Sequence, residues 1–162
     1  MRGKTWLRAA TIGVLSLLGS VLVACGDEGT AGDGAATVSV TLDEWSVASE
    51  PASVGAGEVT FEISNVGEET HEFVVIATDL GILDLPTAED GSAEEGTGEL
   101  EVVDEVEDVA AGASATLPVD LEPGHYVLIC NIVEEEMEMD EMEMDHDPSH
   151  FQNGMRTEFT VE

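Results

Sequence analysis

The sequence predicts an all-β protein built as an antiparallel β-sandwich or barrel. Short runs of alternating apolar and polar residues recur along the chain, with turn residues such as Gly, Pro, Asn and Asp between them. None of these runs shows the 3.6-residue period of a long helix. At least six such runs follow residue 35, which is the pattern of a sandwich or barrel made of short strands.

The expected strands differ in how strictly they alternate. In the run GEVTFEISNVG, the side chains of Val59, Phe61 and Ile63 share one face. By contrast, HEFVVIAT (residues 71–78) is apolar almost throughout, as expected of a central strand. The remaining runs are ATVSVTLDEW, ASATLPVDLEPG, HYVLICNI and MRTEFTVE, at residues 36–45, 113–124, 125–132 and 155–162.

A long segment interrupts this pattern between residues 79 and 109. It is rich in Gly, Pro and acidic residues, and a further strand is suggested at residues 100–103. Connections of this length are unusual in compact domains, so we expect a short helix or an irregular loop here.

The chain begins with a stretch typical of an export signal. Residues 1–24 carry three basic and no acidic residues, and the uncharged stretch after Arg8 is short for a membrane span, which needs about 20 apolar residues. This stretch ends in LVAC, which resembles a bacterial or archaeal lipobox, and a Gly- and Asp-rich tether follows at residues 25–36. We therefore expect export and lipidation of Cys25, with a plain cleaved signal or an uncleaved anchor as the alternative.

The charged residues are unevenly distributed. All 36 Asp and Glu residues follow residue 24, where Arg156 is the only Lys or Arg. Such a surface has no basic patch for phosphates, which excludes nucleic-acid binding of that kind. Because the strand pattern argues against disorder, we expect a folded protein with a strongly solvated, salt-adapted surface. An acidic surface shaped for a basic partner is the alternative.

Four side chains have the chemistry of metal ligands. His71 opens one expected strand and Cys130 closes another, while His150 and Met155 lie five positions apart before the last strand. A thiolate, two imidazoles and a weakly bound thioether are the ligand set of a blue-copper centre. Each residue alone would more often be structural, but the four together, in register with the strands, predict a copper site.

The body of the chain resembles the cupredoxin family of blue-copper proteins, which includes plastocyanin, halocyanin and sulfocyanin. The stretches NVGEETHEFVV, GHYVLICNI and HFQNGMRTEFTVE carry the resemblance. It implies a Greek-key β-sandwich over residues 37–162. It also implies one type 1 copper ion bound by the four residues His71, Cys130, His150 and Met155.

One departure from the family pattern lies between Cys130 and His150, which are usually only a few residues apart. Here an acidic, Met-rich insert at residues 133–148 lengthens the connection, and loop-closure entropy tolerates such an insertion. His146 is a rival to His150 as a ligand. The spacing to Met155 favours His150.

The insert has two interpretations. It is either a solvated loop of low complexity, or it is a second, labile Cu(I) site formed by soft thioethers and an imidazole. The residues of this possible secondary site are Met137, Met139, Met142, Met144 and His146.

These observations predict a lipid-anchored, monomeric electron carrier on the extracytoplasmic face of the cell membrane. Its partners would be redox proteins of the membrane or cell envelope. We do not expect an enzyme, because no acid–base pair stands apart from the general acidity. The alternative function is copper binding or copper delivery in the cell envelope through the Met-rich insert. A third alternative, an adhesion-type sandwich without metal, would leave Cys130 as a free thiol.

Overall fold

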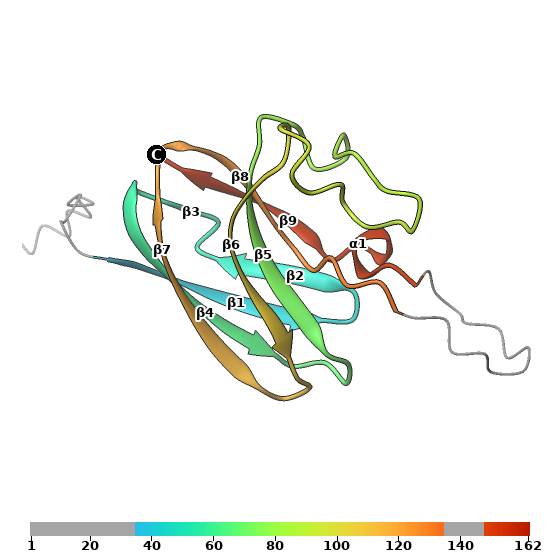
Figure 1. The fold of residues 1–162 in the computed structure, drawn as a ribbon. Helices are drawn as coiled ribbons and strands as arrows, with labels where there is room; N and C mark the ends of the chain where they lie inside the picture. Colours follow the sequence, from blue (N-terminus) through green and yellow to red (C-terminus); the bar gives the residue numbers. More distant parts are fainter. Residues whose placement is uncertain (1–34, 135–147) are drawn as a thin grey trace, which may run out of the picture. The chain divides into compact units, whose positions relative to one another are not determined.

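A computed structural model of the chain describes residues 35–134 and 148–162, which form two facing β-sheets (Figure 1). The first sheet has the order β2-β1-β4-β7, with strands at Ser46–Glu50, Ala36–Asp43, Gly57–Asn65 and Ser114–Leu121. The second has the order β3-β9-β8-β5-β6, with strands at Ser53–Val54, Arg156–Val161, Gly124–Ile129, His71–Ala77 and Glu101–Val109. One short helix, α1 (His150–Asn153), precedes β9.

The predicted all-β sandwich is confirmed, although the sheets are mixed and not purely antiparallel. Strand β1 pairs with β4 in parallel, and β3 pairs with β9 in parallel. The reason lies in the path of the chain. After the antiparallel β1–β2 pair the chain crosses to the second sheet as β3, and it returns on the other side of β1 as β4.

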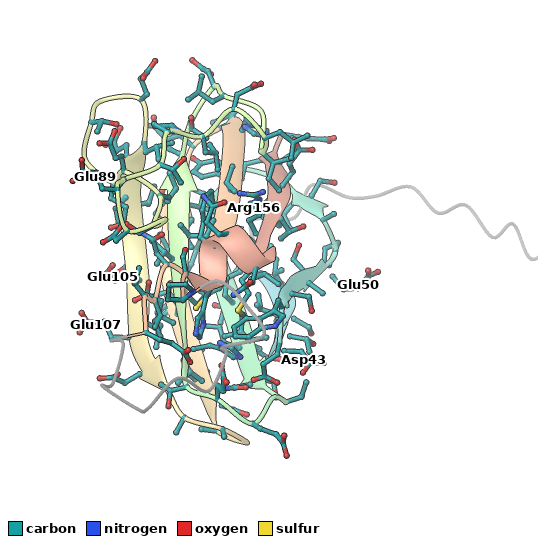
Figure 2. The ribbon with its side chains drawn as sticks, turned by 90° about the vertical axis from the view of Figure 1, so that its right-hand side faces the viewer. Asp43, Glu50, Glu89, Glu105, Glu107 and Arg156 are labelled. Carbon is teal, nitrogen blue, oxygen red and sulfur yellow. The ribbon has the colours of Figure 1, made fainter. Side chains whose placement is uncertain are left out.

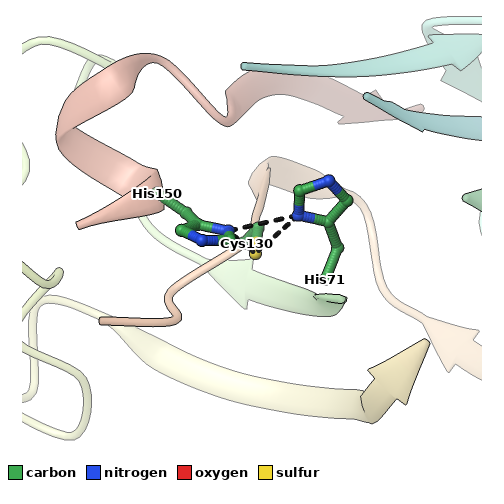
Figure 3. A group of neighbouring side chains, drawn as sticks. All are labelled: His71, Cys130 and His150. Atoms are coloured by element: carbon green, nitrogen blue, oxygen red, sulfur yellow. Dashed lines mark hydrogen bonds between the residues drawn. The ribbon is translucent and has the colours of Figure 1, made fainter. Parts of the chain in front are cut away.

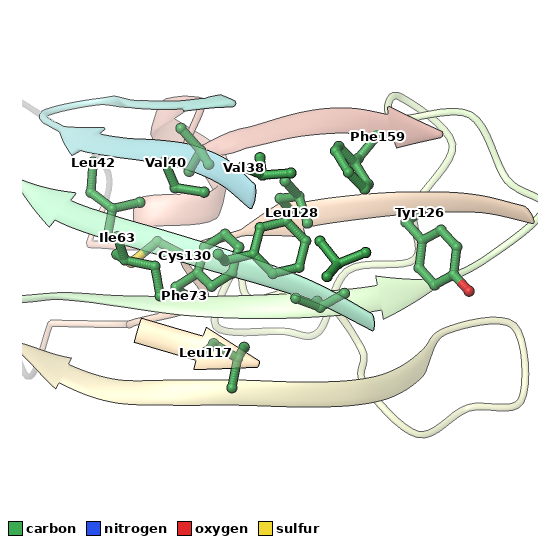
Figure 4. Packing of buried hydrophobic residues seen from close by; sticks show 14 of the residues in the cluster. Val38, Val40, Leu42, Ile63, Phe73, Leu117, Tyr126, Leu128, Cys130 and Phe159 are labelled. Carbon is green, nitrogen blue, oxygen red and sulfur yellow. The ribbon is translucent and has the colours of Figure 1, made fainter. Parts of the chain in front are cut away.

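The main core fills the space between the two sheets (Figure 4). Phe61 lies at its centre, with its ring 5.2 Å from that of Phe73 and 5.5 Å from that of Phe159. The predicted inward face of β4 is confirmed, because Val59, Phe61 and Ile63 are all buried. The alternation of each strand therefore places its apolar residues in this core.

A second apolar cluster covers the outer face of the second sheet. Val74 and Ile76 of β5 pack there against Leu85 and Leu100 of the long connection, and against Phe151 of α1. Strand β5 is therefore buried on both faces, which explains why its sequence is apolar throughout. The segment between β5 and β6 is a covering loop with one isolated bridge, and the suggested strand at 100–103 extends much further, as β6.

Carboxylates surround the described part of the molecule. The side chains of Asp43, Glu50, Glu89, Glu105 and Glu107 point outward into solvent (Figure 2). Strand β6 forms one edge of the second sheet and exposes all of its acidic residues. Charge on an edge strand opposes pairing with another chain, so this edge is protected against aggregation.

Several predicted features lie outside the described residues. These are the export signal at 1–24, Cys25 and most of the tether, and the insert from residue 135 to residue 147. The predictions made for them remain predictions. No helix in the described part is long and apolar enough to cross a membrane.

Candidate metal centre

His71 is the first residue of β5, and its side chain is completely buried. The pairing of β5 with β6 shifts register between His71 and Phe73, so a β-bulge lies directly beside the histidine. His71 lies on the same face of β5 as Phe73 and Val75 of the main core, so the two-residue period of the strand places its ring inside the sandwich.

Cys130 follows directly after β8 and is also completely buried. Its Sγ atom accepts a hydrogen bond from the backbone N–H of Glu72, at 3.4 Å. Burial raises the pKa of the Cys130 thiol to about 11, although the N–H groups of Glu72 and Ile132 act in the opposite direction. Without a cation beside it, the sulfur is therefore a protonated thiol at neutral pH.

His150 is the first residue of the short helix α1, and Met155 follows shortly after the helix ends. Ser149 caps this helix by accepting a hydrogen bond from the N–H of Gln152. Gly154 ends it with a φ of 119°, a conformation that favours glycine. The N–H of Met155 donates to the carbonyl of His150 at 3.1 Å, so the two residues belong to one compact turn.

Backbone hydrogen bonds join this turn to the strand that carries the cysteine. The N–H of Cys130 donates to the carbonyl of Met155 at 3.0 Å, and the N–H of His150 donates to the carbonyl of Ile132 at 3.0 Å. The side chain of Met155 is completely buried in the main core, to which Cys130 also belongs. The two ends of the long connection between Cys130 and His150 therefore lie next to each other.

Three donor atoms converge at this place (Figure 3). The Nδ1 atoms of His71 and His150 lie 3.1 Å apart, and the Sγ atom of Cys130 lies 3.9 Å from the first and 3.4 Å from the second. A point equidistant from the three atoms lies about 2.0 Å from each, which is close to the usual metal–imidazole bond and somewhat short of a metal–thiolate bond of about 2.3 Å. The group therefore has the dimensions of a metal site, and its donor set fits copper.

Glu44 holds the far side of the His71 ring. Its Oε1 atom lies 3.0 Å from His71 Nε2 and also accepts a hydrogen bond from the N–H of Glu69. Burial acts to raise the pKa of Glu44, but the backbone N–H donors of Glu69 and Glu68 outweigh it, so the pKa is lowered overall. An ionised carboxylate only accepts hydrogen bonds. In a neutral His71, the proton is therefore on Nε2, and Nδ1 presents its lone pair to the donor group.

Glu72 joins the strand of His71 to the strand of Cys130. Its N–H donates to the Cys130 sulfur, and its carboxylate Oε1 accepts from the N–H of Asn131 at 2.8 Å. The Asn131 side chain in turn binds both backbone groups of Ala93, in the covering loop. These bonds fix the relative positions of the two strands and hence of two of the three donors.

The outer edge of His150 is covered and not open to solvent. Only 1 % of the side chain is exposed. Its Nε2 atom lies 3.8 Å from a carboxylate oxygen of Glu69 and 3.8 Å from one of Glu134. The ring of Trp45 meets the imidazole edge-on, with the ring centroids 4.9 Å apart.

Comparison with solved structures supports the fold. No family model and no curated protein matches the chain. Among solved structures, a dithionite-reduced auracyanin from Roseiflexus castenholzii matches with a TM-score of 0.51 at 17 % identity, over 80 % of this chain and 99 % of that one. Auracyanin A from Chloroflexus aurantiacus, a blue copper protein, matches with a TM-score of 0.50 at 14 % identity, over 80 % of this chain and 100 % of that one. Auracyanin B matches with a TM-score of 0.50 at 20 % identity, over 79 % of this chain and 89 % of that one.

The chain has the cupredoxin fold. Within this fold the structure brings together His71, Cys130 and His150 directly, and it places Met155 in the adjoining turn. The rival His146 lies outside the described residues, as do Met137, Met139, Met142 and Met144.

Sequence reasoning missed two residues that contact the donor group, Glu44 and Glu72. Glu44 contacts His71, and Glu72 contacts both Cys130 and the neighbouring Asn131. Neither stands out among 36 acidic residues. The position of Glu72, directly after His71, is the only local signal that could have pointed to one of them.

Proposed function

We propose that this protein is an exported, membrane-tethered type 1 copper protein that carries single electrons. One observation carries the proposal: two imidazole nitrogens and one thiol sulfur converge in a buried triangle of metal-site dimensions. The donor set of a blue-copper centre is two histidines and one cysteine with a weak axial ligand, for which we propose the Met155 thioether.

When bound, copper would supply reversible one-electron chemistry between Cu(I) and Cu(II). The protein's part is to hold the ligands still. His71 is fixed by Glu44, Cys130 by the N–H of Glu72, and His150 by the capped turn of α1. Burial of all three donors excludes water from the site. A rigid, dry ligand set suits both oxidation states without ligand exchange, which favours electron transfer over catalysis.

The cellular setting and partners are part of the proposal. The export signal and the motif ending in Cys25 support a lipid-anchored protein on the extracytoplasmic face of the membrane. The acidic surface supports redox partners of the membrane or cell envelope that present basic residues. The strong negative net charge supports a monomeric state, because copies of so acidic a chain repel one another.

A Cu(II) titration of residues 26–162, followed by visible absorption and electron spin resonance, tests the proposal. This part of the chain contains every residue of both apolar clusters. We expect an intense thiolate-to-copper band that saturates at one equivalent. The variants Cys130→Ser and His150→Ala should lose the band, whereas His146→Ala should keep it. A wild-type protein without the band would overturn the electron-carrier function.

A second variant distinguishes electron transfer from copper delivery through the insert. Met137, Met139, Met142 and Met144 are changed together to Leu, which keeps their apolar volume and removes the sulfur. For an electron carrier, the variant retains the band and cycles between the two oxidation states without losing copper. For a delivery protein, transfer of Cu(I) to a chelator would depend on these methionines.

A further inference from the structure

The structure points to Glu44 as a positioning residue that sets the hydrogen-bonding state of His71 and thereby favours Cu(II) over Cu(I). This inference rests on the proposed copper function and adds a residue from outside the ligand set. Glu44 lies in the turn between β1 and β2, and its carboxylate reaches the buried His71 ring at 3.0 Å.

The contact acts on the donor atom through the ring. Because the carboxylate accepts the Nε2 proton, the Nδ1 lone pair of His71 faces Cys130 and His150. A hydrogen bond from the far ring nitrogen to a carboxylate also makes an imidazole a stronger base. A stronger base stabilises the more highly charged metal ion, so Glu44 should lower the reduction potential.

The Glu44 carboxylate is itself held in place. The N–H of Glu68 lies 3.0 and 3.2 Å from its two oxygens, and the N–H of Glu69 lies 3.0 Å from Oε1. The same loop is braced by Asn65, which donates to the carbonyl of Glu69 and accepts from the N–H of Gly67. The carboxylate therefore cannot swing away from His71 without breaking several hydrogen bonds.

Gly67 leaves the space that the carboxylate occupies. A Cβ atom at this position would overlap the Glu44 carboxylate group. The φ angle of Gly67 is not in the left-handed region, so an alanine here is opposed by the carboxylate and not by backbone strain. Gly67→Ala should therefore push the carboxylate away from His71 while leaving the charge of the protein unchanged.

The test compares Glu44→Gln and Gly67→Ala with a matched control, Glu68→Gln. The Glu68 side chain is exposed, so the control removes the same charge from the neighbouring loop without a contact to His71. Residues 26–162 are used, and Cu(I) and Cu(II) affinities are measured by competition with chelators. Thermal unfolding of the metal-free variants checks that each one folds.

We expect Glu44→Gln to weaken Cu(II) binding about tenfold relative to Cu(I), the lower end of the loss typical for partners of metal ligands. For one electron, this ratio corresponds to a potential about 59 mV higher. Gly67→Ala should shift the ratio in the same direction, and Glu68→Gln should leave it within about twofold of wild type. Equal ratios for Glu44→Gln and Glu68→Gln would overturn the inference.

A measurement without copper keeps the inference separate from the proposed function. Nitrogen-15 NMR of the metal-free protein reports which ring nitrogen of His71 carries the proton. We expect the proton on Nε2 in the wild type, in Glu68→Gln and in Glu44→Gln, whose amide oxygen still accepts a hydrogen bond, and a loss of this preference in Glu44→Leu, which has no acceptor. A wild-type protein that binds no copper would overturn the proposed function and the redox part of this inference, but NMR would still decide whether Glu44 sets the state of His71. A proton on Nδ1 in the wild type would overturn that part as well.

Discussion

The Nδ1 atoms of His71 and His150 lie 3.1 Å apart, although 79 positions separate the two residues in the chain. Two N–H groups cannot point at each other, so with both imidazoles neutral at least one of these two atoms is an acceptor. Glu44 accepts a hydrogen bond from the Nε2–H of His71 on the far side, so Nδ1 of His71 is an acceptor, and an N–H on Nδ1 of His150 would complete the contact. A metal held by these nitrogens would replace this proton, and His150 would then carry its proton on Nε2, which faces Glu69 and Glu134.

Metal binding should release one proton, and that proton comes from Cys130. The histidines only exchange tautomers, whereas the thiol, whose pKa burial raises to about 11, is protonated at about pH 8 and must become a thiolate. Affinity should therefore rise with pH up to about 11. Zn(II), which binds thiolate and imidazole without redox chemistry, serves as the probe. Calorimetry in two buffers of different protonation enthalpy should show about one proton more for wild type than for Cys130→Ser. Equal proton release by wild type and Cys130→Ser would contradict the assignment of the released proton to Cys130.

Glu72→Gln should stabilise the metal-free protein at neutral pH. Burial raises the pKa of Glu72, and neighbouring carboxylates add to this effect, while the N–H of Asn131 opposes it. The folded protein thus holds this proton more tightly than the unfolded chain does. The stability that Glu72 contributes is present below its ordinary value of 4.5 and is lost as pH rises through the raised value.

Urea unfolding checks this prediction, with Glu62→Gln as the control. Glu62 is exposed on β4, so its replacement removes one charge from the surface only. At about pH 7, Glu72→Gln should unfold at a higher urea concentration than wild type and than the control, because glutamine still accepts from Asn131. Well below pH 4.5 the difference should vanish. A difference that persists there would mean that packing, and not charge, is responsible.

Asn65→Ala should lower the free energy of unfolding by about 2–3 kcal/mol, because it leaves buried backbone groups without partners. The Asn65 side chain is buried and donates to the carbonyls of Glu69 and Val109, at 2.7 and 2.8 Å. Denaturant unfolding measures the loss, and Thr116→Ala, at an exposed position of β7, should stay within about 0.5 kcal/mol of wild type. Similar losses for the two variants would show that Asn65 has no special role in the loop.

Salt should stabilise the protein. The chain has 36 acidic residues against 4 Lys and Arg, and the exposed carboxylates of β6 lie close together. Between about 0.01 M and 1 M salt, the Debye length falls from about 30 Å to about 3 Å, which screens this repulsion. We expect the unfolding temperature to rise by about 5 °C or more, the shift that roughly 1 kcal/mol produces in a small domain.

The double variant Glu105→Gln/Glu107→Gln serves as the comparison for the salt measurement. Both residues are exposed on the edge strand β6 (Figure 2). The variant should start from a higher unfolding temperature at low salt and gain less from added salt, because less repulsion remains to be screened. An unfolding temperature that does not depend on salt in either protein would contradict the role given to the acidic surface.

The sandwich and most of its strands could be predicted from the sequence, because the two-residue period of a strand is a local property. Val59, Phe61 and Ile63 are buried together, as their spacing requires. Strand β6 was predicted only in part, since an edge strand with mostly exposed positions lacks that alternation. The parallel pairing of β1 with β4 could not be predicted, because nothing within either strand encodes the direction of its neighbour.

The sequence by itself determined which residue types could form the site and the order in which they occur. His71 opens an expected strand, and Cys130, His150 and Met155 belong to one connection. Only the tertiary structure decided that three of these donors meet within 4 Å of one another. It also decided that Glu44, one of 36 acidic residues, contacts His71. Contacts between residues far apart in the chain arise when two sheets pack, and no local pattern records which side chains then become neighbours.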